Sequence, residues 1–146
     1  MKGLLVTVSS ALFLFSGMAL AGNMQSLNKS QVNDQLKGKT ITTISLVTMD
    51  GSLLDNNAFT GYFDATGKLQ GQMANKPDNE PVSDSGTWTV KSNGVLCATW
   101  QHWNNNSPIC VSVYKVNNGL LFINEKTHKL ETIVLDSNIQ TGNKIS

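Results

Sequence analysis

From residue 39 onward, apolar and polar residues alternate along most of the chain, in short runs that are rich in β-branched residues. Turns that contain glycine, asparagine or proline separate these runs, and Asn93-Gly94 is the strongest hairpin signal among them. The last ten residues form a polar tail. We therefore predict about eight strands, at residues 39–49, 58–64, 68–74, 85–91, 95–101, 109–116, 120–125 and 128–136.

Connections this short favour antiparallel pairing between neighbouring strands. An antiparallel meander of this length must close on itself or double over, because open edges would otherwise pair with other chains. The pattern therefore predicts a mainly β protein. The favoured fold is a small antiparallel up-and-down barrel, either lipocalin-like or a related meander, and a β-sandwich is the alternative.

One short helix is predicted before the strands, at about residues 29–37. Asn28 stands at the N-cap position, and Gln31 is placed to complete a capping box. Val32 and Leu36 lie four residues apart and share one face. A helix of this length is unstable alone, so we expect its apolar face to dock on the strands.

The first 21 residues have the features of a secretory signal peptide. Lys2 precedes an apolar stretch over 4–15, and Ala19-Leu20-Ala21 supplies small residues for cleavage. The apolar stretch is short for a membrane span of about 20 residues. We therefore predict a signal peptide at 1–21, a single exported domain at 22–146, and no stable membrane insertion after cleavage.

The predicted mature domain is electrically neutral. The chain has eleven basic residues, all lysine, and ten acidic ones, and Lys2 belongs to the leader, which leaves ten of each sign. A neutral chain without arginine lacks the basic surface that nucleic-acid binding requires. We therefore expect no nucleic-acid partner.

Two cysteines in an exported chain most simply form one disulfide bond. Pairing Cys97 with Cys110 sets the register of a hairpin and encloses about 14 residues, a constraint worth about 3 kcal/mol. The cysteines then share a face with polar neighbours. The opposite face is apolar and carries Leu96, Ala98, Trp100, Ile109, Val111 and Val113.

No pattern of catalytic or metal-binding residues stands out. The cysteine spacing differs from C-x-x-C, no serine has a nucleophile-elbow motif, and too few ligands accompany His102 for a zinc site. Most of the aspartates fall where turns or helix positions are predicted. We expect no catalytic residues, no metal and no cofactor.

Two groups of residues are candidates for binding. Trp103, with His102 and Gln101, lies in a polar loop that the disulfide restrains, and an aromatic side chain held there suits contact with a partner. The alternative is that Trp103 folds back over the barrel end. Trp88, with Phe59 and Phe63, is expected to line the barrel mouth.

The order of several short motifs resembles a family of small secreted bacterial domains of unassigned function. The motifs are L-x-G-x-T at 36–40, G-x-W at 86–88, L-C-x-x-W at 96–100, C-x-x-V-Y at 110–114 and a terminal Gly142-Asn143. The resemblance implies a disulfide between the two cysteines and an exported domain, but no activity. The chain departs from the family at Asn104–Asn106, where acidic or arginine residues are common.

The sequence therefore predicts a periplasmic or extracellular binding protein that is not an enzyme. Its partner would be an unknown small molecule or protein. In the first hypothesis, a small apolar ligand enters the barrel mouth. In the alternative, the loop over 101–108 makes the protein an interaction or inhibitor module that acts on an envelope or host factor. An enzyme is the third and least favoured hypothesis.

Overall fold

A computed structural model describes residues 24–44, 46–47, 53–55, 59–73 and 80–145. The predicted signal peptide therefore lies outside the described residues. The described segments form one α-helix, eleven strands and two short 3₁₀ turns. In chain order these are α1 (Lys29–Leu36), β1 (Lys39–Thr42), β2 (Leu46–Val47), β3 (Leu53–Asp55), β4 (Phe59–Phe63), β5 (Lys68–Met73), β6 (Ser83–Val90), β7 (Leu96–Trp100), η1 (Trp103–Asn106), β8 (Ile109–Val116), β9 (Gly119–Asn124), β10 (Leu130–Leu135), η2 (Asp136–Asn138) and β11 (Ile139–Thr141).

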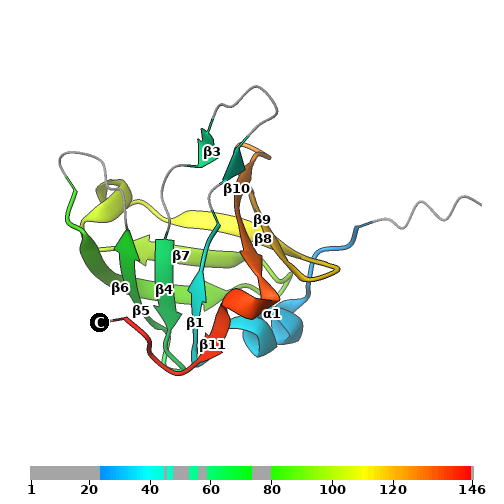
Figure 1. The fold of residues 1–146 in the computed structure, drawn as a ribbon, viewed down its shortest axis with the longest axis horizontal. Coiled ribbons are helices and arrows are strands. Elements are labelled where there is room, and N and C mark those ends of the chain that lie inside the picture. Colours follow the sequence, from blue (N-terminus) through cyan, green and yellow to red (C-terminus); the bar gives the residue numbers. More distant parts are fainter. Residues whose placement is uncertain (1–23, 45, 48–52, 56–58, 74–79, 146) are drawn as a thin grey trace, which may run out of the picture.

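Nine of the strands form one antiparallel sheet, in the order β10-β9-β8-β7-β6-β5-β4-β1-β11 (Figure 1). The sheet curls until its two ends meet at β1. Lys39 and Ile41 of β1 pair with β11, and a bridge joins Ile44, just beyond β1, to Ile133 of β10. β10, η2 and β11 therefore act as a single bent strand. Counting them as one leaves eight strands in a nearly closed up-and-down barrel, so the predicted barrel is confirmed and the sandwich alternative is wrong.

Two predicted boundaries need correction. The run over 39–49 is not one strand, because β1 ends at Thr42 and the chain then enters the separate two-stranded ladder β2–β3. Residues 45, 48–49, 58 and 74 of the predicted strands lie outside the described residues. The predicted polar tail also contains a strand, since β11 pairs with β1 and the Thr40 hydroxyl donates to the Gly142 carbonyl at 2.7 Å. This segment joins the sheet through backbone hydrogen bonds, which the polarity of its side chains does not indicate.

Side chains alternate between the two faces of the barrel wall, as the period of a strand requires. In the β7–β8 hairpin, Cys97 pairs with Cys110 in the predicted register, and their sulfurs form the predicted disulfide. The cysteines lie on the outer face. The predicted apolar face is also confirmed, because Leu96, Trp100, Val111 and Val113 are buried and Ala98 and Ile109 pack against them.

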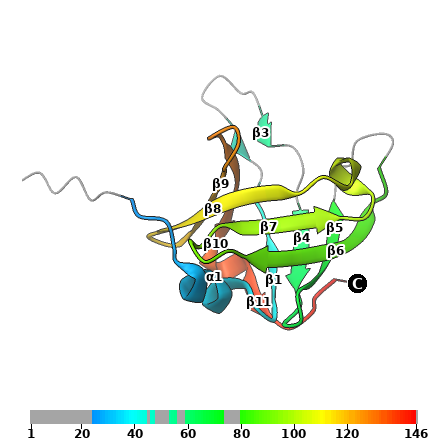
Figure 2. The ribbon, with the colours of Figure 1, turned by 180° about the vertical axis from the view of Figure 1, so that it is seen from behind.

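Helix α1 covers one end of the barrel, where β5 and β7 begin (Figure 2). The predicted capping box is present, with Asn28 and Gln31 exchanging backbone and side-chain hydrogen bonds. Val32 and Leu36 are both 0% exposed, which confirms that the apolar face docks on the strands. We call this end, with Phe63 and Trp88, the helix end. The opposite end, where β4, β6 and β8 begin and η1 lies, is the cavity end.

Candidate functional site

Three aromatic rings gather at the cavity end of the barrel. Phe59 opens β4, Trp100 closes β7, and Trp103 opens η1. The centroids of the two indole rings lie 4.6 Å apart, and Phe59 meets them edge-on at 5.7 and 6.2 Å. The Trp103 ring is 1% exposed, and its Nε1 donates to the Pro81 carbonyl at 2.8 Å. The cluster is therefore fixed in place by packing and by a hydrogen bond.

A pair of glycines makes room for these rings. Gly61 of β4 and Gly71 of β5 lie directly opposite each other in the sheet. A Cβ at Gly71 would come within 2.5 Å of the Trp100 ring and 2.6 Å of the Trp103 ring. The ring of Phe59 lies equally close over Gly61. The rings thus pack on bare backbone, an arrangement that glycine allows in a strand.

Below the rings lies a cavity of about 240 Å³ inside the barrel. Its lining is mainly apolar and comes from seven strands of the barrel, from η1 and from Thr43, which follows β1. The lining residues within the described part of the chain are Ile41, Thr43, Phe59, Phe63, Leu69, Met73, Leu96, Ala98, Trp100, Trp103, Ile109, Val111, Phe122, Glu131 and Thr132. A mainly apolar lining with a few polar groups is typical of a small-molecule site.

A β-bulge in β10 places two polar residues on the cavity. The register of β10 against β9 shifts between Leu130 and Thr132, so Glu131 is the extra residue. Glu131 and Thr132 therefore both line the cavity, although they are neighbours in the sequence. The Thr132 hydroxyl is the one buried side-chain polar atom among the described residues that has no hydrogen-bond partner.

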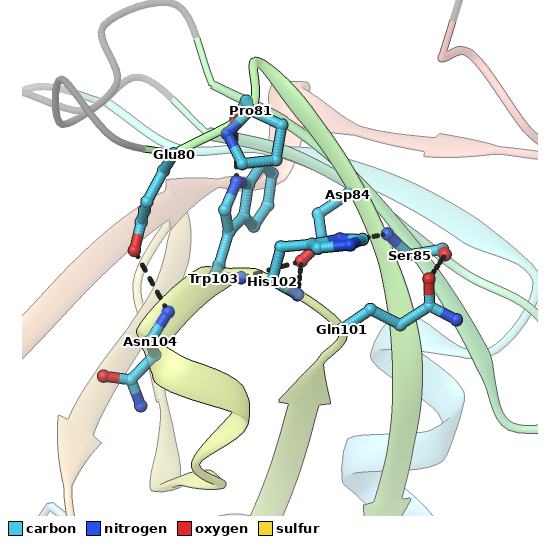
Figure 3. A network of polar contacts seen from close by, with 8 residues as sticks. All are labelled: Glu80, Pro81, Asp84, Ser85, Gln101, His102, Trp103 and Asn104. Atoms are coloured by element: carbon cyan, nitrogen blue, oxygen red, sulfur yellow. Dashed lines mark hydrogen bonds and ion pairs between the residues drawn. The ribbon is translucent and has the colours of Figure 1, made fainter.

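A buried aspartate holds the loop that carries Trp103 (Figure 3). Asp84 lies in β6 with its side chain only 1% exposed. Its carboxylate accepts hydrogen bonds from the backbone N–H groups of Ser85 and His102 at 2.8 Å and of Trp103 at 2.9 Å. It also contacts His102 Nδ1 at 2.9 Å. Because a carboxylate only accepts, this nitrogen carries the proton.

These contacts keep Asp84 ionised. Burial by itself would raise the pKa of the Asp84 carboxyl, because it disfavours the charged form. Hydrogen bonds from the Trp103 and His102 backbones, from the His102 ring and from Ser85 outweigh burial. The pKa of Asp84 therefore lies below its ordinary value of 3.8. The negative charge of Asp84 thus strengthens its hydrogen bonds to the backbone N–H groups at the start of η1.

The asparagine run after Trp103 adopts the left-handed backbone conformation. The φ angles of Asn104, Asn105 and Asn106 are 54°, 50° and 55°. Asparagine tolerates this region better than other residues with a side chain. The run therefore reverses the chain between β7 and β8, with the Asn104 N–H also bonded to Glu80.

The predicted site residues separate in space. Of the two positions considered for Trp103, the structure shows the one in which the ring folds inward over the barrel end, so the ring is not presented to a partner outside the barrel. Trp88 is also buried, but it packs against Phe63 at the helix end and does not line the cavity. Gln101 and His102 are exposed on the outside, where Gln101 accepts a hydrogen bond from the Ser85 hydroxyl. Phe59 and Phe63 do line the cavity, as predicted.

Three residues that matter here were not predicted from the sequence. Asp84 is not among the predicted site residues, although it alternates with Gly86, Trp88 and Val90 and so shares their inner face. That alternation was a usable signal. Gly71 and Thr132 had no comparable signal. The close approach of rings to the Gly71 backbone and the bulge before Thr132 leave no mark in a single sequence.

Comparisons of this chain with protein-family models, curated proteins and solved structures give no match. The resemblance to small secreted bacterial domains therefore stays a prediction. Within the described segments, no group of three or more histidine, cysteine, aspartate or glutamate residues is arranged to hold a metal ion. In the same part of the chain, no helix is long and apolar enough to cross a membrane. The fold and the cavity are thus the observations on which a function can be proposed.

Proposed function

We propose that this protein binds a small apolar molecule inside the cavity end of its barrel, and that it acts as a binding protein and not as an enzyme. The observation that carries the proposal is the apolar cavity of about 240 Å³ beneath Trp100 and Trp103. Pockets for drug-sized ligands usually measure about 300–1,000 Å³. An apolar cavity of about 150 Å³ is enough to bind benzene. The ligand should therefore be no larger than one or two rings or a short chain.

The wall around the cavity supports this proposal because packing and hydrogen bonds within the protein hold it in place. The aromatic cluster rests on the Gly61–Gly71 pair, and the Asp84 carboxylate holds the start of η1 through three backbone bonds. A preformed pocket loses less conformational entropy on binding than one that must order itself. The same contacts keep the Trp103 ring inside, so no observation favours the alternative in which this ring binds a protein partner.

The disulfide also bears on where the protein acts. A Cys97–Cys110 bond indicates a non-cytoplasmic, oxidising environment. We extend the proposal to export into the periplasm or the extracellular space, with residues 1–21 as the signal peptide. Appearance of a mature chain that starts at Gly22 in the periplasmic or culture fraction would test this part.

Tryptophan fluorescence offers a direct test of binding, because Trp100 and Trp103 line the cavity and Trp88 does not. A Trp88→Phe variant, which retains both cavity reporters, would be titrated with methylcyclohexane and with cyclohexanol. We expect a saturable change in emission with at least one of these compounds. A Trp100→Phe/Trp103→Phe variant, which keeps Trp88, should respond much less.

A cavity-filling variant would establish where the ligand binds. Ala98 faces the cavity, so Ala98→Leu in the Trp88→Phe background should weaken binding at least tenfold. Thr99→Leu is the matched control, because Thr99 is the next residue on the same strand and faces outward. Failure of both compounds to bind, or equal binding to the Ala98→Leu variant, would show the proposal to be wrong.

A further inference from the structure

The cavity has few polar groups, and they differ in whether they already have a hydrogen-bond partner. The Thr43 hydroxyl accepts a hydrogen bond from the Phe59 N–H at 2.9 Å, so it is engaged in holding β4. The Thr132 hydroxyl lies buried in the same wall without a partner among the described residues. Buried polar atoms are nearly always hydrogen-bonded, and an exception needs an explanation. A group supplied by the ligand provides one.

The local backbone supports the same explanation. In a regular strand, Glu131 would point away from the barrel and the two residues would lie on opposite faces. The bulge between Leu130 and Thr132 instead brings both side chains to the cavity. Bulges are frequent next to binding sites, where they redirect a side chain. The irregularity in β10 therefore builds the polar part of the cavity.

Glu131 indicates which charge the ligand can carry. Its carboxylate accepts a hydrogen bond from the Asn124 side chain at 2.6 Å, and the residue itself is exposed. This places a negative charge at the rim of the cavity. A carboxylate ligand would meet a like charge on entry, whereas a neutral ligand would not. The rim thus disfavours fatty acids and other anions.

We infer that the occupant of the cavity is a small neutral molecule with one hydroxyl or carbonyl group on an apolar body, and that the Thr132 hydroxyl binds this group. The inference rests on the proposed function and narrows it to one class of ligand. The apolar body lies among the aromatic cluster and the aliphatic wall. The polar group meets the hydroxyl that the barrel leaves unpaired.

Three ligands with one common ring test this inference in the Trp88→Phe background: cyclohexanol, methylcyclohexane and cyclohexanecarboxylate. Each would be titrated against the unchanged background and against Thr132→Val, which removes the hydroxyl and preserves the shape of the side chain. We expect Thr132→Val to weaken cyclohexanol binding about three- to tenfold, the usual effect of one neutral hydrogen bond. Methylcyclohexane should bind both proteins equally or favour the variant.

Thr89→Val is the matched control, because Thr89 is an exposed strand residue on the outer face of β6. It should change no affinity. Cyclohexanecarboxylate at neutral pH should bind at least tenfold more weakly than cyclohexanol, and Glu131→Gln should reduce this difference. Thermal unfolding of the Thr132→Val variant gives an independent readout, since loss of an unpaired hydroxyl should leave the fold as stable or more stable.

The possible outcomes separate the inference from the proposed function. If methylcyclohexane binds and Thr132→Val leaves cyclohexanol binding unchanged, the inference is overturned and the proposed function stands. If the carboxylate binds as tightly as the alcohol, the ligand need not be neutral and the inference is again overturned. If none of the three compounds binds the Trp88→Phe protein, both proposals fail together.

Discussion

The two ends of this barrel are closed in different ways. At the helix end, α1 inserts Val32 and Leu36, each 0% exposed, and Trp88 packs edge-on against Phe63 with their centroids 5.4 Å apart. At the cavity end, a polar loop replaces the helix, and Trp103 with Trp100 leaves a cavity beneath the rings. Both ends use tryptophan, yet Trp100 and Trp103 line the cavity and Trp88 does not.

The difference comes from what covers each end. An amphipathic helix supplies aliphatic side chains and satisfies its own backbone, so it can fill a barrel mouth completely. A short loop must find partners for its backbone groups, and here the inward-facing Asp84 provides them. The helix end therefore stabilises the fold, and the cavity end holds polar and aromatic groups that a ligand can use. The predictions below test this division.

The largest effect is expected from removing the carboxylate that anchors the loop. Asp84→Ala should lower the free energy of unfolding by about 4 kcal/mol, because several buried N–H groups lose a charged acceptor. Urea denaturation would measure this loss. Asp34→Ala, at an exposed position on α1, is the control and should change stability little.

The Asp84 carboxylate also makes the stability of the folded protein depend on pH, in a direction that its pKa shift determines. Because the pKa of Asp84 is lowered in the folded state, its stabilising contribution is fully present above the ordinary value of 3.8. The contribution is lost as the pH falls through the lowered pKa. The stability difference between the wild type and Asp84→Asn should therefore be largest at neutral pH and shrink in acid. A difference that grows in acid would contradict this role.

The disulfide on the outer wall should contribute stability without shaping the cavity. A Cys97→Ser/Cys110→Ser variant opens a bond between residues 13 positions apart and should lose about 3 kcal/mol of stability. Because both sulfurs lie outside the barrel, ligand affinity at a temperature where the variant is folded should stay within about twofold, well below the effect of one hydrogen bond. A large loss of affinity in the folded variant would show that the bond also supports the cavity end.

Small-to-large substitutions compare packing at two points of the β7–β8 hairpin. Val113 is 0% exposed, so Val113→Leu should destabilise the protein by about 1–3 kcal/mol through overpacking. Ala98 faces the cavity, so Ala98→Leu should change stability by less than about 1 kcal/mol although it adds more atoms. Thermal unfolding would measure both variants. Equal destabilisation would mean that the cavity end is already filled.

The smallest effect concerns the left-handed turn. Asn105→Ala should lower stability by about 1 kcal/mol, because alanine adopts positive φ at a cost that asparagine largely avoids. Asn105→Gly should cause no loss, since glycine accepts this conformation freely. Chemical denaturation of the two variants side by side would measure the difference. Equal losses would mean that the asparagine side chain matters here and its backbone conformation does not.

The sequence predicted the regular parts of this molecule well. Alternation within 95–101 and 109–116 predicted the inner face of the hairpin, and the cysteine pair predicted its register. Asn28 and Gln31 predicted the helix start because capping is a local interaction. Features that depend on the alternation of side chains along a strand, or on residues close together in the chain, can be predicted from a single sequence.

The candidate site was predicted less well because it depends on exceptions to these rules. The polar neighbours of Trp103 left two positions open for its ring, outside the barrel or folded over its end, and the contact that decides between them is to the Asp84 carboxylate, 19 positions away. The bulge at Glu131 and the glycine pair beneath the rings are long-range or irregular features. Local polarity does not encode them, so the cavity could only be found in three dimensions.

The closure of the ring at β1 has a consequence for how the chain folds. Thr40 and Gly142, whose side chain and carbonyl are bonded in the finished molecule, stand 102 positions apart. Contacts this distant in the chain slow folding, because a long segment must be ordered before they can form. Until residues 139–141 pair with β1, the first strand of the barrel keeps one unpaired edge, which exposes the unfolded chain to aggregation. A chain truncated before residue 139 should therefore accumulate as an insoluble product, although it would retain the cavity-lining residues described above.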